Sequence, residues 1–193
     1  MGNFEFDGQK YKNASTHQKE WGTRIISELN LKGTERILDL GCGDGVLTKL
    51  LAEKVPEGKV LGVDASIGML ETAKELEGCN LSFKHLDINE LDYNEEFDLI
   101  FSNAALQWVK NHELLLDNCL RALKINGVIR FNFAGDGNSS NFFEVVRKLF
   151  KELRYSDYFE SFEWPWFMPT LLQYEKLVSQ HNFGEWKDRK SFK

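Results

Sequence analysis

Residues 37–45 read ILDLGCGDG, and this stretch decides the fold of the 193-residue chain. An apolar β-type run leads into three glycines at alternate positions, and a helical pattern begins at Val46. Glycine lets the backbone turn tightly and approach a ligand closely. The stretch therefore predicts a strand, a ligand-binding loop and a helix, in that order, within an α/β domain.

Short β-type runs alternate with longer helical patterns between residues 36 and 133. This alternation is typical of a parallel sheet covered by helices. We expect a Rossmann-like, open and mostly parallel sheet with helices on both faces, strand order 3-2-1-4-5 and a further C-terminal strand. The expected strands are Arg36–Leu40, Lys59–Val63, Leu81–His85, Phe97–Ser102 and Val128–Phe133.

The overall composition excludes several kinds of partner. The net charge is −6 and the basic residues are scattered, so we do not expect nucleic acid to bind. The three cysteines lie far apart in the sequence and suit neither a disulfide framework nor a metal site. No apolar segment is long enough to span a bilayer or to act as a secretion signal. We therefore expect a cytoplasmic protein that uses no metal and no membrane.

Acidic residues beside the glycines indicate the charge of the expected ligand. The dinucleotide fingerprint requires a glycine where Val46 stands, and Asp39 and Asp44 would repel a pyrophosphate. A cationic ligand is favoured instead. S-adenosylmethionine carries an ammonium and a sulfonium, and we expect Asp39 to act on that charged end directly or through water.

Two further aspartates end the next two expected strands. Asp64 could accept hydrogen bonds from both hydroxyls of a ribose. Asp87 could read an adenine amino group while Met69 or Ile88 packs on the ring. Each aspartate could instead cap a helix. All of them lie at the carboxyl edge of the sheet, where open α/β proteins bind ligands.

Four motifs resemble those of class I methyltransferases: ILDLGCGDG, LGVDAS with Met69, HLDINEL and FDLIFSNAALQWV. The last motif is similar to the branch that contains the trans-aconitate and malonyl carrier-protein methyltransferases. The resemblance implies S-adenosyl-L-methionine as cofactor, S-adenosyl-L-homocysteine as product, and a small-molecule acceptor methylated on a carboxylate or hydroxyl oxygen. The implied cofactor contacts are Gln18, Asp39, Gly41, Cys42, Gly43, Asp64, Ala65, Met69, Asp87, Ile88, Ser102 and Asn103.

The N-terminal segment resembles the part of these enzymes that closes over the cofactor. Its candidates are Tyr11, His17, Gln18 and Trp21, although Trp21 also fits an ordinary helical packing stripe. Methyl transfer depends mainly on alignment of the acceptor, so a base is optional. The candidate catalytic residues are His17, Tyr11 and Asn103. His112 is a further candidate base, but NHELLLDN is typical of a helix start, so its His or Asn is expected to be a cap or an exposed residue.

We expect one domain, 1–193, with an N-terminal cap helix in 1–32, a cofactor-binding core in 33–133, and an acceptor lid with an incomplete C-terminal part in 134–193. The aromatic run from Tyr155 to Phe167 predicts an apolar lid, a packing cluster or a contact in a homodimer. Thr170 is expected to cap a last helix that reaches Gln180. Because few residues follow, we expect the seventh strand of the family to be missing.

Three alternatives to a methyltransferase remain open at this point. The chain could bind S-adenosylmethionine without turnover, it could be an aminopropyl transferase, or it could be an NAD-dependent oxidoreductase. Asn103 stands where an aminopropyl transferase would carry an acid after the fourth strand, and Val46 counts against a dinucleotide loop.

Overall fold

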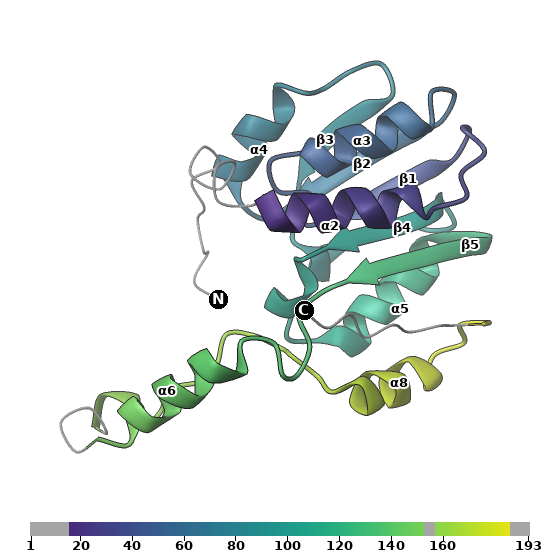
Figure 1. The fold of residues 1–193 in the computed structure, drawn as a ribbon. Coiled ribbons are helices and arrows are strands. Elements are labelled where there is room, and N and C mark those ends of the chain that lie inside the picture. Colours follow the sequence, from purple (N-terminus) through teal and green to yellow (C-terminus); the bar gives the residue numbers. More distant parts are fainter. Residues whose placement is uncertain (1–15, 153–156, 186–193) are drawn as a thin grey trace.

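The computed structural model describes residues 16–152 and 157–185. Its centre is a parallel sheet of order β3-β2-β1-β4-β5, which confirms the predicted topology. Figure 1 shows the sheet between layers of helices, with α6 projecting from its C-terminal side. The strands are β1 (Arg36–Leu40), β2 (Lys59–Asp64), β3 (Leu81–His85), β4 (Phe97–Asn103) and β5 (Leu123–Asn132).

The last strand begins earlier than predicted, at Leu123 instead of Val128. Leu123 pairs with Phe97, and regular pairing resumes where Val128 meets Leu99. Between these points the chain turns through Asn126, whose φ is +66°. Asn-Gly is a turn signal, so the sequence pattern placed the start of the strand after this irregularity.

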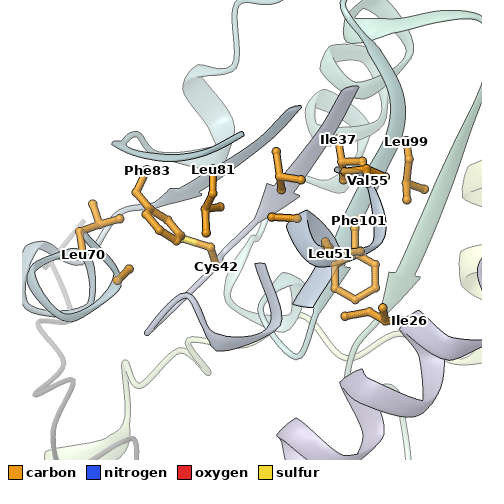
Figure 2. Close-up of a cluster of buried hydrophobic side chains, with 13 residues drawn as sticks. Ile26, Ile37, Cys42, Leu51, Val55, Leu70, Leu81, Phe83, Leu99 and Phe101 are labelled. Atoms are coloured by element: carbon orange, nitrogen blue, oxygen red, sulfur yellow. The ribbon is translucent and has the colours of Figure 1, made fainter. Parts of the chain in front are cut away.

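Two layers of helices bury the two faces of the sheet. One face is covered by α2 (Thr16–Ser27), α3 (Val46–Lys54) and α4 (Ile67–Lys74), and the other by α5 (His112–Ala122). In Figure 2, Ile26 of α2 lies beside Phe101 and Leu51, and all three side chains are fully buried. Complete burial of such a side chain stabilises the fold by about 1.5–3 kcal/mol.

Helix α4 packs on the sheet through only part of its apolar stripe. Ile67 is 56% exposed because it opens α4, whereas Leu70 and Ala73, further along the same stripe, are buried. The cap of this helix is Ser66, whose side chain accepts a hydrogen bond from the backbone N–H of Met69. The apolar stripe of α4 therefore begins to pack on the sheet only after Ile67, the first residue of the helix.

The part of the chain after β5 departs from the sheet and returns to it. Helix α6 (Ser140–Phe150) contains no buried residue, and a short helical segment at 157–159 follows it. We call residues 137–152 and 157–166 the aromatic arm. At its base, the backbone N–H of Asp136 donates to the carbonyl of Pro169 at 2.9 Å, which brings the two ends of the arm together.

The last helix, α8 (Leu171–Ser179), begins at a complete capping box formed by Thr170 and Gln173, as the sequence predicted. Helix α6 has Ser139 at its N-cap position, but the φ of Ser139 is +56° and its side chain makes no capping hydrogen bond. In residues 16–152 and 157–185 no strand follows β5. None of the helices in these residues is both long and apolar enough to cross a membrane.

Candidate functional site

The loop between β1 and α3 needs glycine at each of its three alternate positions. Gly41, Gly43 and Gly45 have φ values of +69°, +56° and +77°, a region that side chains other than glycine rarely adopt. A Cβ on Gly41 would lie 2.2 Å from the Cβ of Ala105. The loop therefore packs closely on the segment that follows β4 at Gly41. The positive φ values at all three positions account for the GxGxG spacing.

Asp64, at the end of β2, holds this loop in place. Its Oδ2 accepts a hydrogen bond from the backbone N–H of Gly43 at 2.9 Å, and its Oδ1 accepts one from Ser66 at the same distance. Each carboxylate oxygen has two lone pairs, so these bonds leave acceptor capacity for a ligand. Asp64 thus combines a structural role, which the sequence did not indicate, with the predicted place at the edge of the sheet.

Asp39, the last acid before the glycines, is a buried carboxyl group. It is 2% exposed and accepts a hydrogen bond from the Thr48 hydroxyl at 2.7 Å. Burial raises the pKa of Asp39 to about 7; Thr48 opposes this shift and the charge of Asp64 adds to it. A desolvated carboxyl with this pKa gains from a neighbouring cation, which would favour its ionised form.

A small cavity lies between α2 and the glycine loop. Lys19 reaches into it from α2, and its Nζ lies 2.8 Å from Oδ2 of Asp44. Lys19 was not predicted from the sequence, although Lys19, Gly22 and Ile26 share one helical face and a lysine on such a face indicates a buried polar contact. The residues that line the cavity are Lys19, Asp39, Gly41, Cys42, Gly43, Asp44, Leu47 and Asn103.

The ion pair between Lys19 and Asp44 corrects the expectation about the charge of the site. Asp44 and Asp39 were both expected to repel an anionic ligand, but the ammonium of Lys19 offsets the charge of Asp44. The electrostatic preference for a cation therefore rests on Asp39.

The residues expected around ribose and adenine lie along the carboxyl ends of β2 and β3. Ala65 is exposed, whereas Met69 and Ile88 are buried in the apolar core. Asp87 caps the 3-10 helix η1 (Ile88–Glu90) and accepts hydrogen bonds from the backbone and side-chain nitrogens of Asn89 at 2.8 and 2.7 Å. The capping alternative for Asp87 is confirmed, and its contact with adenine stays a prediction.

The end of β4 supplies two predicted residues with different surroundings. Ser102 is fully buried and its hydroxyl donates to the carbonyl of Leu40 at 2.7 Å, so it joins β4 to β1. Asn103 lines the cavity, and its Oδ1 accepts a hydrogen bond from Asn132 at 2.8 Å. The next residue, Ala104, has a φ of +58°. Such backbone strain is often found at functional sites.

The remaining candidates near the N-terminus are only partly described. Tyr11 lies outside the described residues, and so do the side chains of His17 and Gln18, whose backbones belong to α2. Trp21 is 40% exposed. Cys42 turns its side chain away from the loop into the core beside Phe83 (Figure 2), and burial raises the pKa of its thiol.

His112 differs from the expectation of a cap or an exposed residue. The cap is Asn111, while His112 is buried, with Nε2 2.9 Å from the carbonyl of Leu106 and Nδ1 3.2 Å from the Tyr174 hydroxyl. Because a carbonyl only accepts, Nε2 carries the hydrogen and Tyr174 donates to Nδ1. Burial lowers the pKa of His112. His112 and Tyr174 together join α8 to the 3-10 helix η2 (Leu106–Trp108), which follows β4.

The aromatic rings of the arm pack mainly on one another. Phe150 stacks on Phe159 with a centroid distance of 3.8 Å, and Phe143 meets Trp164 edge-on at 5.0 Å. The arm meets the rest of the domain at Trp166, which lies 5.6 Å from the half-exposed Trp108 of η2, and at Glu163, which pairs with Lys110 at 3.3 Å. This arrangement agrees with the packing-cluster alternative for most of the rings.

The comparison with known proteins shows which family the chain resembles. Residues 37–127 match a family described as a methyltransferase domain. The matched residues of the methyltransferase domain run from β1 into β5 and include the glycine loop, Asp39, Asp64 and Asp87.

Individual relatives carry the same family name. A malonyl-[acyl-carrier protein] O-methyltransferase of Acetivibrio thermocellus is 32% identical over 77% of this chain and 54% of its own length. A trans-aconitate 2-methyltransferase of Deinococcus radiodurans is 44% identical over 49% of this chain and 36% of its own length. The chain thus spans about half or less of these two relatives.

Solved structures share the fold. An S-adenosylmethionine dependent methyltransferase from Mesorhizobium loti has a TM-score of 0.54 at 30% identity, over 60% of this chain and 53% of that one. Phosphoethanolamine N-methyltransferase 2 of Haemonchus contortus has a TM-score of 0.66 at 22% identity, over 83% and 36% of the two chains. The second likeness shows the fold alone.

Proposed function

We propose that the chain binds S-adenosyl-L-methionine at the glycine loop and transfers its methyl group to a small-molecule acceptor. The observation that carries this proposal is Asp39, a desolvated acid beside a loop of left-handed glycines. Such a site suits a cationic ligand and disfavours a pyrophosphate. The family match and the cofactor named for the Mesorhizobium loti structure support the same ligand.

The proposed contacts follow the carboxyl edge of the sheet. Gly41, Gly43 and Asp39 would hold the methionine end, and Asp64 would accept hydrogen bonds from the ribose hydroxyls. Asp87 and Ile88 would border the adenine, with Ala65 and Met69 nearby on the loop and helix after β2. The backbones of Cys42 and Ser102, together with Gln18 and Asn103, complete the proposed contacts.

The bound cofactor would supply an activated methyl group, so the protein has to align an acceptor and exclude water. Asn103 at the end of β4 lines the cavity, and it would border the acceptor together with the next residue, the strained Ala104. His17 and Tyr11 remain proposed as bases for an acceptor that must lose a proton. A carboxylate needs no base because it is already ionised at neutral pH.

We propose O-methylation of a carboxylate or a hydroxyl as the reaction. The acceptors named for the two curated relatives, a malonyl group on an acyl-carrier protein and trans-aconitate, are both carboxylic acids. A net charge of −6, with basic residues scattered along the sequence, also favours a small acceptor over a nucleic acid.

Calorimetric titration with S-adenosylhomocysteine, NAD and NADP tests the cofactor. We expect only S-adenosylhomocysteine to bind, and we expect Asp39→Asn to weaken its binding at least tenfold. The control is Asp92→Asn, which changes an exposed acid outside the cavity. Binding of NAD without S-adenosylhomocysteine would refute the proposal.

Transfer of a labelled methyl group tests the reaction. The assay supplies S-adenosylmethionine with trans-aconitate, malonyl carrier protein, short carboxylic acids and phenols in separate reactions. We expect an acid to yield a base-labile methyl ester. Binding of the cofactor with no transfer to any acceptor would favour the non-catalytic alternative.

A further inference from the structure

The turn that follows β4 is held by hydrogen bonds from several segments, and we call its residues 104–107 the β4 turn. The backbone N–H of Ala104 donates to the carbonyl of Asn132 in β5 at 2.7 Å, and the Gln107 side chain donates to the carbonyl of Ala104 at 2.7 Å. The backbone N–H of Phe167 donates to the carbonyl of Gln107 at 2.8 Å. These bonds stabilise a turn in which Ala104 has a φ of +58°.

His112 supplies a further bond to the β4 turn from the interior of the domain. Its Nε2 donates to the carbonyl of Leu106 at 2.9 Å, while its Nδ1 accepts from the hydroxyl of Tyr174 in α8 at 3.2 Å. The imidazole also packs on the rings of Phe167 and Phe133, with centroid distances of 4.4 and 5.4 Å. Because His112 is 2% exposed and Leu106 is fully buried, water does not compete for the bond between them.

We propose that His112 is a positioning residue for the methyl acceptor: through Leu106 it holds the β4 turn and so fixes Asn103 and Ala104. The inference rests on the proposed function, in which the acceptor lies beside Asn103 and Ala104. His112 is not among the residues that line the cavity, and both of its ring nitrogens are bonded within the protein. It therefore acts on the reaction through the turn and not as a base.

The close packing of the β4 turn gives its position a consequence for the site. A Cβ on Gly41 would lie 2.2 Å from the Cβ of Ala105, so the turn rests directly on the glycine loop. Asn103, which precedes the turn, lines the cavity. A shift of the turn would therefore change the space for the acceptor, and misplacement of a reacting group by about 1 Å can lower the rate about a hundredfold. The bond from His112 opposes such a shift.

Two amide variants of His112 test the inference as a matched pair. The nitrogen of Gln stands at the ε position, from which it can donate to Leu106, whereas the nitrogen of Asn stands at the δ position beside Tyr174. The assay measures ester formation from trans-aconitate and from malonyl carrier protein. We expect His112→Asn to lower kcat by about tenfold to a hundredfold. His112→Gln should keep kcat within about threefold, and KM for S-adenosylmethionine should change by about threefold or less in both variants.

Two controls separate positioning from loss of folded protein. Each kcat is divided by the fraction of the chain that binds S-adenosylhomocysteine in a calorimetric titration, so that unfolded chains do not count. Leu81→Ala removes a buried side chain at the start of β3, at the end of the strands opposite the glycine loop. It should lower stability and leave the corrected kcat within about threefold. Equal losses of kcat in His112→Asn and His112→Gln, or in His112→Asn and Leu81→Ala, would overturn the inference.

Amide hydrogen exchange supplies a readout that needs no acceptor. In the presence of S-adenosylhomocysteine, peptides that cover residues 103–109 should exchange about tenfold faster in His112→Asn than in the wild type. Peptides from α3 should exchange at equal rates in the two proteins, and His112→Gln should resemble the wild type throughout. Unchanged exchange over residues 103–109 in His112→Asn would show that His112 does not hold the turn.

The outcome also distinguishes this inference from the proposed function. If the wild-type chain bound no S-adenosylhomocysteine or methylated no acceptor, the proposed function would fail and the role of His112 with it. If the wild type methylated an acid and His112→Asn did so at the same corrected rate, only the role of His112 would be overturned.

Discussion

The sheet and the aromatic arm both contain apolar side chains but bury them to different degrees. In β1 every residue after Arg36 is buried, and Phe101 of β4 is fully buried. In α6 no residue is buried, and Phe142 is 57% exposed. An apolar stripe therefore specifies a helix or a strand, whereas its burial depends on the surface that lies opposite.

The physical reason is the number of neighbours that each element has. A central strand has partners on both edges and a helix on each face, so its side chains lose nearly all contact with water. The arm has mainly its own return segment to pack against, through contacts such as Phe150 with Phe159. We expect the sheet to unfold as one cooperative unit and the arm to open at lower cost.

The largest predicted effect compares one aromatic ring in each region. Phe101→Ala should lower the free energy of unfolding by about 3–5 kcal/mol because it leaves a cavity in the core. Phe150→Ala should lower it by about 1 kcal/mol, the scale of an aromatic pair. Urea unfolding followed by circular dichroism measures both. Equal losses would mean that arm and sheet form a single cooperative unit.

The second prediction uses the buried acid of the sheet. The pKa of Asp39 is raised from 3.8 to about 7 in the folded state, so the folded protein holds this proton more tightly than the unfolded chain. Its contribution to stability is present below about pH 4 and is lost as the pH rises to about 7. The total loss is about 4 kcal/mol.

Unfolding of the wild type and of Asp39→Asn between pH 4 and 8 measures the pH-dependent contribution of Asp39 to stability. The stability of the wild type relative to the variant should fall with rising pH, and S-adenosylhomocysteine should offset more of the loss at pH 8 than at pH 6. A pH-independent difference between the two proteins would show that Asp39 is already ionised at low pH.

The third prediction compares two glycines with similar backbones. Gly41 and Gly137 have φ values of +69° and +84°, but a Cβ on Gly41 meets Ala105 whereas one on Gly137 meets nothing within 4 Å. Gly41→Ala should cost about 3 kcal/mol and abolish cofactor binding. Gly137→Ala should cost about 1 kcal/mol and leave binding unchanged. Thermal unfolding and titration with S-adenosylhomocysteine provide the two readouts.

The smallest predicted effect compares the caps of the two helices outside the sheet layers. Thr170→Ala removes a capping hydrogen bond from α8 and should cost about 1 kcal/mol. Ser139→Ala at α6 removes no such bond and should change stability by about 0.3 kcal/mol or less. Differential scanning calorimetry resolves the two. A larger loss at Ser139 would show that the hydroxyl has a partner in solution.

Much of the site could be predicted because its signals are local. The order of strand, glycines and helix predicts the loop, and aspartates that follow successive parallel strands must meet at one edge of the sheet. Lys19 was not predicted because its ion pair with Asp44 depends on where α2 crosses the glycine loop. The spacing of residues along the chain does not determine that position. His112 was expected to be a cap or an exposed residue because its contact with Tyr174, 62 positions away, cannot be read from the local sequence.

The amino-acid sequence by itself determined the strand order, the left-handed glycine loop and the line of acids along the sheet edge. These follow from local backbone preferences and from the alternation of strands and helices. Only the tertiary structure decided that Asp39 is desolvated, that Lys19 offsets Asp44, and that the aromatic rings pack within the arm. Burial and ion pairing depend on distances between elements, and those distances are established only when the elements pack together.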